Sequence, residues 1–157
     1  MSFHKGKLGE SIVFDLLEKA GFSCVYNAEK NYKYDILAYL NDDISYKIEV
    51  KNDEYSLQSG NVAIENWNTK KDKKSGLTST NADIWCHIID KPYFTSVKRL
   101  KSFCKDNKPF KKVERGGDKN ARLLIYKIEK IKPIFYSLEE DENVIHLKEI
   151  LEELVCE

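Results

Sequence analysis

The strongest constraint in this sequence is a pair of short segments in which apolar and polar residues alternate on either side of a turn. Residues 34–40 place Ile36, Ala38 and Leu40 at alternate positions, and residues 44–51 repeat the alternation. A period of two is that of a β-strand with one buried face. The residues between the segments, Asn-Asp-Asp at 41–43, are typical of a turn. The sequence therefore predicts a β-hairpin over residues 34–51.

The alternation also restricts how the two strands pair. If residues 41–43 form the turn, Ile36 faces Ile48 and Asp35 lies directly opposite Glu49. A slip of two residues would pair Asp35 with Lys51 instead. A slip of one residue is disfavoured, because it would set the apolar face of one strand against the polar face of the other. Either allowed register brings Asp35 beside Glu49 and Lys51.

These three side chains suggest chemistry on phosphodiesters. Two carboxylates that face each other repel unless a cation lies between them or one of them is protonated. Oxygen ligands of this kind suit Mg²⁺ or Mn²⁺. Lys51 could orient a water molecule or neutralise charge on a phosphate under attack. The alternative is a cross-strand salt-bridge cluster on a solvated sheet face, which the trio alone leaves open.

The spacing of these residues resembles a nuclease signature. Asp35, thirteen intervening residues, and then Glu-Val-Lys at 49–51 look like the motif of the PD-(D/E)XK superfamily. The departure is Tyr34, which stands where the motif has proline, at a position that varies widely in the family. The segment 6–10, GKLGE, also resembles the Gly-Glu start of Holliday junction resolvases and related phage and restriction endonucleases. Glu10 fits that role, and an exposed helix-dipole glutamate is the alternative.

A second block resembles small phage-type nucleases of the same superfamily. It comprises residues 61–65, 75–77 and 80–85, so the resemblance spans residues 6–85. In that setting Glu65 is a candidate auxiliary residue for a second metal or a water molecule. The alternative for Glu65 is a strand-end charge paired with a lysine.

The family mechanism assigns a role to each matched residue. The resemblance implies that Asp35, Glu49 and the backbone carbonyl of Val50 hold Mg²⁺. It implies that Lys51 positions the attacking water, and that Glu10 assists the water or binds a second ion. In-line attack would break the bond to the 3′ oxygen and leave a 5′ phosphate.

The charges of the chain are segregated, although the net charge is zero. Residues 91–132 carry 14 Lys and Arg against 4 Asp and Glu, whereas residues 133–157 carry 1 against 8. The excess of ten positive charges in residues 91–132 predicts a surface that contacts phosphates. The alternative is a solvated basic face. The residues that we expect to contact DNA, from this segment and from a lysine-rich loop before it, are Lys70, Lys71, Lys73, Lys74, Lys98, Arg99, Lys111, Lys112 and Arg115.

Periodicity and turn residues predict the remaining elements. Helices are expected over residues 7–21, with Gly21 as the C-terminal cap, over 95–105, capped by Thr95 or Ser96, and over 143–155. Further strands are expected over 24–26, 83–89 and 121–131, with loops over 52–60, 70–76 and 108–120. Residues 61–67 fit either a strand or the start of a helix.

The whole pattern predicts an α/β fold with a restriction-endonuclease-like core, a mixed β-sheet flanked by helices. We expect one nuclease domain over 1–157, with a catalytic core (1–90), a basic DNA-contacting segment (91–132) and an acidic C-terminal helix (133–157). The N-terminus lacks the apolar core of a signal peptide, and no run of apolar residues could cross a membrane. An intracellular protein is expected, in the cytoplasm or in a phage-infected host, with reduced cysteines.

The function that these features predict is a Mg²⁺- or Mn²⁺-dependent endonuclease acting on DNA. The three histidines lie far apart in the sequence, which argues against a histidine-metal nuclease, and His87 is expected in the core. A second class is a non-catalytic DNA-binding module on a nuclease-like fold. A third is a protein-interaction domain in which the acidic tail docks onto a basic partner or masks the basic segment. A homodimer would suit coordinated cuts, but no residue specifies one.

Overall fold

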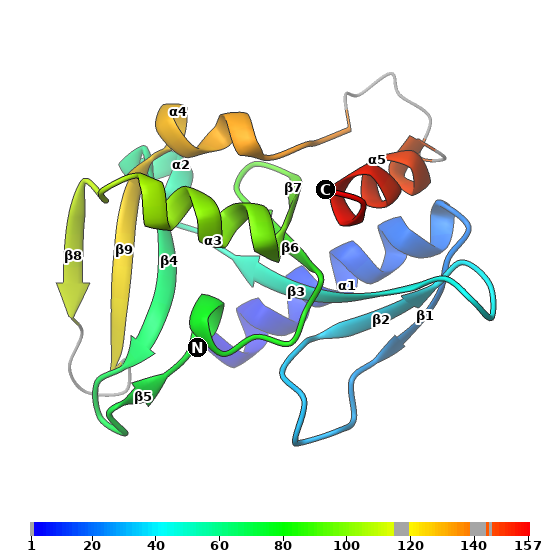
Figure 1. Ribbon diagram of the computed structural model, residues 1–157, viewed down its shortest axis with the longest axis horizontal. Helices are drawn as coiled ribbons and strands as arrows, with labels where there is room; N and C mark the ends of the chain where they lie inside the picture. Colours follow the sequence, from blue (N-terminus) through cyan, green and yellow to red (C-terminus); the bar gives the residue numbers. More distant parts are fainter. Residues whose placement is uncertain (1, 115–119, 139–143, 145) are drawn as a thin grey trace.

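The protein is built on two β-sheets, and its computed structural model describes residues 2–114, 120–138, 144 and 146–157. The first sheet has five strands in the order β1-β2-β3-β6-β7, and the second has four in the order β5-β4-β9-β8 (Figure 1). In the first sheet β3 and β6 run parallel, whereas the other neighbours are antiparallel. The predicted α/β class, a mixed sheet flanked by helices, is confirmed.

The elements have the following bounds. The strands are β1 (Ser23–Tyr26), β2 (Ile36–Tyr39), β3 (Ser45–Asn52), β4 (Asn61–Asn68), β5 (Lys73–Lys74), β6 (Ile84–Ile88), β7 (Pro92–Ser96), β8 (Lys111–Glu114) and β9 (Ala121–Lys127). The helices are α1 (Ser2–Lys19), α2 (Ser56–Ser59), α3 (Val97–Asp106), α4 (Ile128–Ile131) and α5 (His146–Val155), with 3₁₀ turns at Gly76–Thr78 and Lys132–Ile134.

Helix α1 begins five residues before its predicted start and ends at Lys19, two residues before its predicted end. Val13 and Leu17, one turn apart, are fully buried against the first sheet. Gly21 has a φ of +99°, and its N–H donates to the Glu18 carbonyl, while the Phe22 N–H donates to the Leu17 carbonyl. This left-handed cap terminates the helix as predicted.

Strand β6 connects the two halves of the core, because all of its residues are buried. Ile84 and Cys86 belong to the cluster that α1 and α5 cover, whereas Trp85 faces a second cluster with α3 and the four-stranded sheet. The predicted strand 83–89 is therefore confirmed in substance, and both of its faces are apolar because each one meets a different layer.

A buried hydrogen-bond chain also joins the two sheets. Trp85 Nε1 donates to His87 Nδ1 at 3.2 Å, and His87 Nε2 lies 3.0 Å from Asp53 Oδ2. Since Nδ1 accepts, Nε2 carries the proton and donates to Asp53. The same Asp53 oxygen accepts from the Ala63 backbone N–H on β4 at 3.0 Å. His87 is thus the satisfied core imidazole that the sequence predicted, and it ties β6 to the turn that leads into the second sheet.

The second sheet contains the elements that the sequence analysis left open or assigned wrongly. Residues 61–67 form strand β4, which pairs antiparallel with β9. The predicted loop 70–76 contains a tight turn and β5, and the predicted loop 108–120 contains β8. Both β5 and β8 are short edge strands whose exposed lysines show no alternation. Their pairing partners, not their own sequences, make them strands.

Three further predictions need correction at their ends. Residues 128–131 are helix α4 and not strand, because the Ile128 N–H bonds to the Gly60 carbonyl where the chain leaves the sheet. The predicted loop 52–60 contains α2. Helix α3 begins at Val97, capped by the Ser96 side chain, and strand β7 precedes it. Helix α5 is described from His146, and residues 143 and 145 lie outside the described residues.

Two whole-chain expectations can be compared with the structure. The thiols of Cys24, Cys86, Cys104 and Cys156 are all free, as predicted. No helix in the described part of the chain is long and apolar enough to cross a lipid bilayer.

The close approach of α1 to the end of β3 depends on Gly9. A Cβ atom at Gly9 would lie 3.0 Å from Asn52 Cβ and 3.2 Å from Ile88 Cδ1, whereas one at Gly6 would have nothing within 4 Å. We expect Gly9→Leu to lower the free energy of unfolding by about 1–3 kcal/mol through overpacking. Gly6→Leu, the matched control, should leave it unchanged or raise it by up to about 1 kcal/mol. Urea denaturation of both variants measures this, and equal effects would contradict the packing role of Gly9.

Candidate active site

The β2–β3 hairpin places Asp35 beside Glu49. Ile36 pairs with Ile48 and Ala38 pairs with Tyr46, and Asp35 comes directly before the first paired residue, where its carboxyl group contacts that of Glu49. The N–H of Leu40 donates to the carbonyl of Ile44 and closes the turn. This is the first of the two predicted registers. The pairing of Asp35 with Lys51 does not occur.

Asp35 is anchored to the neighbouring strand by its side chain. Its Oδ2 accepts from the backbone N–H of Val50 at 2.7 Å, and its own N–H donates to the Ile48 carbonyl at 2.9 Å. Asp35 comes directly before β2, so its side chain takes the Val50 N–H at the point where regular strand pairing ends. The carboxylate therefore has a defined position at the edge of the hairpin.

Glu49 is the most perturbed acid of this group. Its side chain is only 13% exposed. Burial raises the pKa of Glu49 to about 7, and the charge and contact of Asp35 raise it as well, whereas Lys51 and the Thr80 hydroxyl act in the opposite direction. A carboxyl with a pKa near neutrality in a polar cluster is a common feature of functional sites. Lys51 and Thr80 thus only partly offset the effect of burial and of the Asp35 charge on the ionised form of Glu49.

The positive charge of Lys51 stabilises the ionised form of Glu49. Its Nζ lies 3.6 Å from Glu49 Oε2, and its side chain is 39% exposed. Lys51 is two residues beyond Glu49 on the same face of β3, as the alternation predicted. The ammonium group therefore contacts both the carboxylate and solvent.

Glu10 reaches this cluster from α1. Its side chain is 17% exposed. Burial and the charge of Asp35 raise the pKa of Glu10, whereas the charges of Lys7 and Lys51 lower it. The adjacent Gly9 packs against Asn52 and so brings this turn of the helix to the end of β3. The structure thus brings Glu10 within electrostatic range of the predicted trio.

Thr80 is a member of the site that the sequence analysis missed. Its Oγ1 lies 3.2 Å from Glu49 Oε1 and 3.1 Å from the Lys33 carbonyl, and it accepts from the Ala82 N–H at 3.1 Å. A hydroxyl has one proton, so it can donate to the Lys33 carbonyl or to Glu49 but not to both. Thr80 begins one of the segments that resemble phage-type nucleases, but its partners are distant in sequence and no local pattern reveals them.

Two close contacts with β4 hold the segment that delivers Thr80. Gly76 has a φ of +56°, and a Cβ there would come within 2.2 Å of the Glu65 carbonyl oxygen. Thr78 Oγ1 donates to the Asn66 carbonyl at 2.6 Å. The 3₁₀ turn Gly76–Thr78 is therefore seated directly on β4, because only glycine permits both the backbone conformation and the approach.

Glu65 does not join the acidic cluster in any interaction of the described residues. It lies on β4, paired with Leu123 of β9, and its backbone seats Gly76. It is not among the groups that shift the pKa of Glu49 or of Glu10. Its auxiliary role stays a prediction.

The lysines and arginines predicted to contact DNA fall into three groups. Lys70, Lys71, Lys73 and Lys74 are exposed on the β4–β5 hairpin, and Lys111 and Lys112 are exposed on β8. Lys98 and Arg99 begin α3 and contact Glu157. Arg115 lies outside the described residues. Their contact with DNA stays a prediction.

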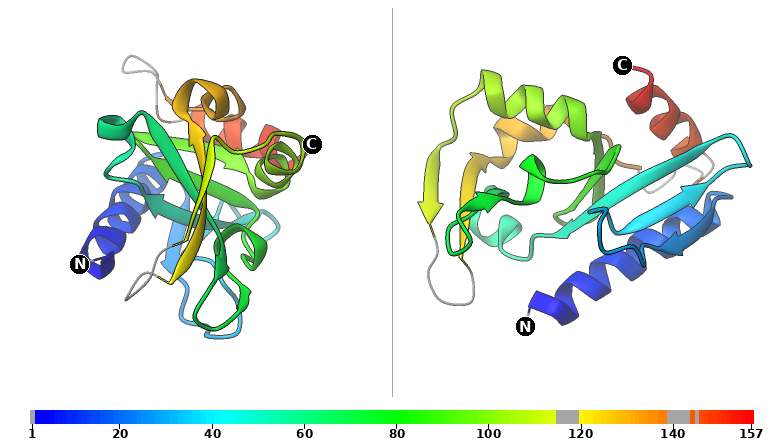
Figure 2. Two further views of the ribbon diagram at one scale, coloured as in Figure 1. Left: turned by 90° about the vertical axis from the view of Figure 1, so that its left-hand side faces the viewer. Right: turned by 60° about the horizontal axis from the view of Figure 1, so that its bottom comes forward.

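The β4–β5 hairpin and the loop of residues 27–35 project to the same side of the molecule (Figures 1 and 2). The Asn27 side chain holds this loop by donating to the carbonyls of Tyr32 and Tyr34 at 2.8 and 3.0 Å. Asn81, next to Thr80, accepts from the Lys33 N–H at 2.7 Å. The loop is thus fixed both internally and to the segment that contacts Glu49.

The atoms at the site that could bind a metal ion are oxygen atoms. Asp35, Glu49 and the backbone carbonyl of Val50 remain the candidate ligands. Within the ranges that the structure describes, no group of three or more His, Cys, Asp or Glu side chains is arranged to hold a metal ion. A cation at Asp35 and Glu49 would therefore need backbone or water oxygens to complete its shell, as Mg²⁺ often does.

Comparison with known proteins supports the fold. No family model matches this sequence, and neither does any curated protein. A bacterial homing endonuclease, I-Ssp6803I, has a similar structure, with a TM-score of 0.56 over 97% of this chain and 94% of that one, at 14% sequence identity. At this identity the likeness shows a shared nuclease-like fold, and it transfers no residue roles.

Glu49 gives the stability of the protein a pH dependence of defined sign. Its pKa is raised on folding, so between its usual value of 4.5 and about 7 the folded state binds a proton that the unfolded chain has lost. The free energy of unfolding should fall as the pH rises through this range, by on the order of 2–3 kcal/mol. Glu49→Gln should flatten the curve in urea denaturation without divalent cations. Identical slopes in the two proteins would contradict this.

The Thr80 hydroxyl should help to keep Glu49 ionised. Thr80→Val preserves the side-chain shape and removes the hydrogen bond that lowers the pKa of Glu49. We expect this variant to raise that pKa above the wild-type value, whereas Thr80→Ser should leave it close to wild type. Carboxyl ¹³C NMR titration measures the pKa directly. An unchanged Glu49 titration in Thr80→Val would show that the hydroxyl serves only the Lys33 carbonyl.

Proposed function

We propose that this protein is a metal-dependent DNA endonuclease whose active site consists of Asp35, Glu49 and Lys51, with Glu10 beside them. The observation that carries the proposal is the contact between the Asp35 and Glu49 carboxyl groups at the end of the β2–β3 hairpin, with the Lys51 ammonium 3.6 Å from Glu49. The fold similarity to a homing endonuclease and the PD-(D/E)XK-like spacing of these residues support it.

The residues present fit Mg²⁺ or Mn²⁺. The pKa of Glu49 is raised because burial and Asp35 both disfavour its ionised form. A divalent cation between the two carboxylates would remove that penalty, and hard oxygen ligands match both ions. Asp35, Glu49 and the Val50 carbonyl would hold the ion. When bound, it would supply positive charge to the phosphate in the transition state.

The other side chains would act on water and on the phosphate. Lys51 is partly exposed beside Glu49, where its ammonium group could orient the attacking water and neutralise negative charge on the phosphate oxygens. Glu10, whose pKa is raised, would take a proton from that water or bind a second ion. In this arrangement Thr80 positions Glu49 and does not contact the substrate.

An extended polyanion suits the surroundings of the site. Four exposed lysines lie on the β4–β5 hairpin, which projects on the same side as the loop of residues 27–35 (Figure 2). Asn81 ties that loop to the segment that carries Thr80, whose hydroxyl lies 3.2 Å from Glu49 Oε1. A duplex or strand of DNA could therefore contact both projections while a phosphate reaches Asp35 and Glu49.

The decisive experiment is a cleavage assay with supercoiled, linear, single-stranded and four-way DNA in Mg²⁺, Mn²⁺ or EDTA. We expect cleavage that requires the divalent ion. Glu49→Ala and Lys51→Ala should each lower the rate by about 100-fold or more, because each removes a charge from the reacting centre. Glu18→Ala and Lys19→Ala, exposed positions on α1, are the matched controls and should cleave as the wild type does.

Two outcomes would contradict the proposal. Cleavage in EDTA, or cleavage that survives Glu49→Ala, would show that this site is not the metal-dependent centre. DNA that is bound but never cut with any metal would favour a non-catalytic DNA-binding module on the same fold.

A further inference from the structure

Several basic residues in the described part of segment 91–132 already have partners within the protein. Lys98 and Arg99 contact Glu157, and the Arg99 guanidinium also lies over the Tyr136 ring, 5.3 Å from its centroid. Arg122 pairs with Glu114 at 2.8 Å. A nucleic acid would have to compete with these internal partners. Lys98, Arg99 and Arg122 are therefore the weaker candidates for phosphate contacts.

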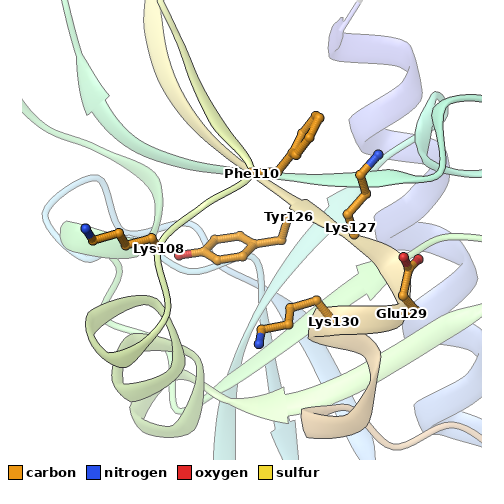
Figure 3. A pocket seen from close by; sticks show the side chains of 6 residues that line it. All are labelled: Lys108, Phe110, Tyr126, Lys127, Glu129 and Lys130. Atoms are coloured by element: carbon orange, nitrogen blue, oxygen red, sulfur yellow. The ribbon is translucent and has the colours of Figure 1, made fainter.

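A different part of the segment lines a pocket at one end of the four-stranded sheet. The pocket has a volume of about 390 Å³ and is lined by Lys108, Phe110, Tyr126, Lys127, Glu129 and Lys130 (Figure 3). Three ammonium groups against one carboxylate make it positively charged. Its volume lies within the range of pockets that hold small ligands.

Phe110 gives this pocket an aromatic surface that the core does not use. Its side chain is 57% exposed. The Phe110 N–H donates to the Ile125 carbonyl at 2.7 Å, so the backbone below the ring is held in place. Lys127 Nζ lies 4.1 Å from the ring centroid. An exposed aromatic ring among lysines is the combination that binds unpaired nucleotides, because a base can stack on the ring while cations contact its phosphates.

The floor of the pocket is rigid. Tyr126 is 1% exposed, and its hydroxyl donates to the Asn107 carbonyl at 2.8 Å. Its ring packs edge-on against Phe103 of α3, with centroids 5.0 Å apart. A preformed floor lowers the entropy that a ligand loses on binding.

The pocket lies away from the lysine-rich hairpin. Lys127 pairs with Asn61 at the first residue of β4, whereas the β5 lysines pair with the last two residues of that eight-residue strand. At about 3.3 Å per residue the two ends are roughly 23 Å apart. A nucleic acid in the pocket would therefore make a contact separate from that of the hairpin.

We infer that this pocket binds an unpaired nucleotide of a DNA strand, with its base stacked on Phe110 and its phosphates at Lys108, Lys127 and Lys130. Bases within a duplex are stacked on each other and present only their edges, so the ring selects a single-stranded segment. The choice of DNA rests on the proposed function. The site itself is independent of Asp35 and Glu49.

Fluorescence anisotropy with a labelled oligo-dT and a blunt-ended linear duplex, both in EDTA, tests the inference without cleavage. Phe110→Ala should weaken single-strand binding about tenfold or more and duplex binding less than about twofold. Phe110→Trp should retain the affinity. Tyr39→Ala, an exposed aromatic residue of the five-stranded sheet, is the matched control and should bind as wild type.

The contribution of Lys127 and Lys130 to binding should be visible in the salt dependence of the affinity for oligo-dT. Lys127→Gln combined with Lys130→Gln should lower the slope of log K against log salt for oligo-dT by about 1.4, or about 0.7 for each phosphate that no longer meets an ammonium group. Lys19→Gln should leave the slope unchanged. Thermal unfolding checks that the variants are folded, as expected for exposed positions.

The results separate this inference from the nuclease proposal. If Phe110→Ala binds oligo-dT as tightly as the wild type, or loses single-strand and duplex binding equally, the pocket assignment is overturned. If the wild-type protein never cleaves DNA but binds oligo-dT through Phe110, the nuclease proposal fails and the pocket stands. Glu49→Ala should lower the cleavage rate by about 100-fold or more without changing oligo-dT affinity.

Discussion

Apolar pairing between β2 and β3 is the interaction on which the site depends. Ile36 and Ile48 face each other and are fully buried, and each contributes on the order of 2–3 kcal/mol by leaving water. This register also brings the Asp35 and Glu49 carboxyl groups together just beyond the last paired residues. Burial of Glu49 and, after it, the charge of Asp35 raise the pKa of Glu49, and the cost is of the same order. The core therefore holds the two acids together although burial and repulsion both disfavour their ionised forms.

Two close backbone approaches bring the remaining groups to this pair. Gly9 lets α1 pack against Asn52, and the next residue, Glu10, then lies within electrostatic range of Asp35. Gly76 lets a 3₁₀ turn sit on the Glu65 carbonyl, and the chain beyond it carries Thr80 to Glu49. In both cases a missing side chain at one position lets a residue one or four positions later reach the candidate site. The site is thus assembled from segments whose separation in the sequence is large.

The two sheets are held in one arrangement by buried groups on β6. Trp85 packs into the second cluster, and the chain from Trp85 through His87 to Asp53 reaches the backbone of β4. A buried imidazole and carboxylate are stable here because each has a hydrogen-bond partner. This link determines how the β4–β5 hairpin stands relative to Asp35 and Glu49.

The sequence by itself determined the hairpin, its parity, the grouping of Asp35, Glu49 and Lys51, and the capping of α1 by Gly21. These features are local. The alternation of apolar and polar residues indicates which face of a strand is buried, and a glycine after an amphipathic helix indicates its C-terminal cap. Only the tertiary structure decided that residues 73–74 and 111–114 are strands, that Thr80 contacts Glu49, and that Arg99 is held by Glu157 while Lys127 lies over Phe110. Edge strands and hydrogen-bond partners depend on residues far away in the sequence. A count of charged residues does not show which of those residues already form ion pairs within the fold. The grouping of the candidate site residues thus follows from local sequence, whereas the contacts that position them, and the choice of which lysines and arginines stay accessible, follow from tertiary packing.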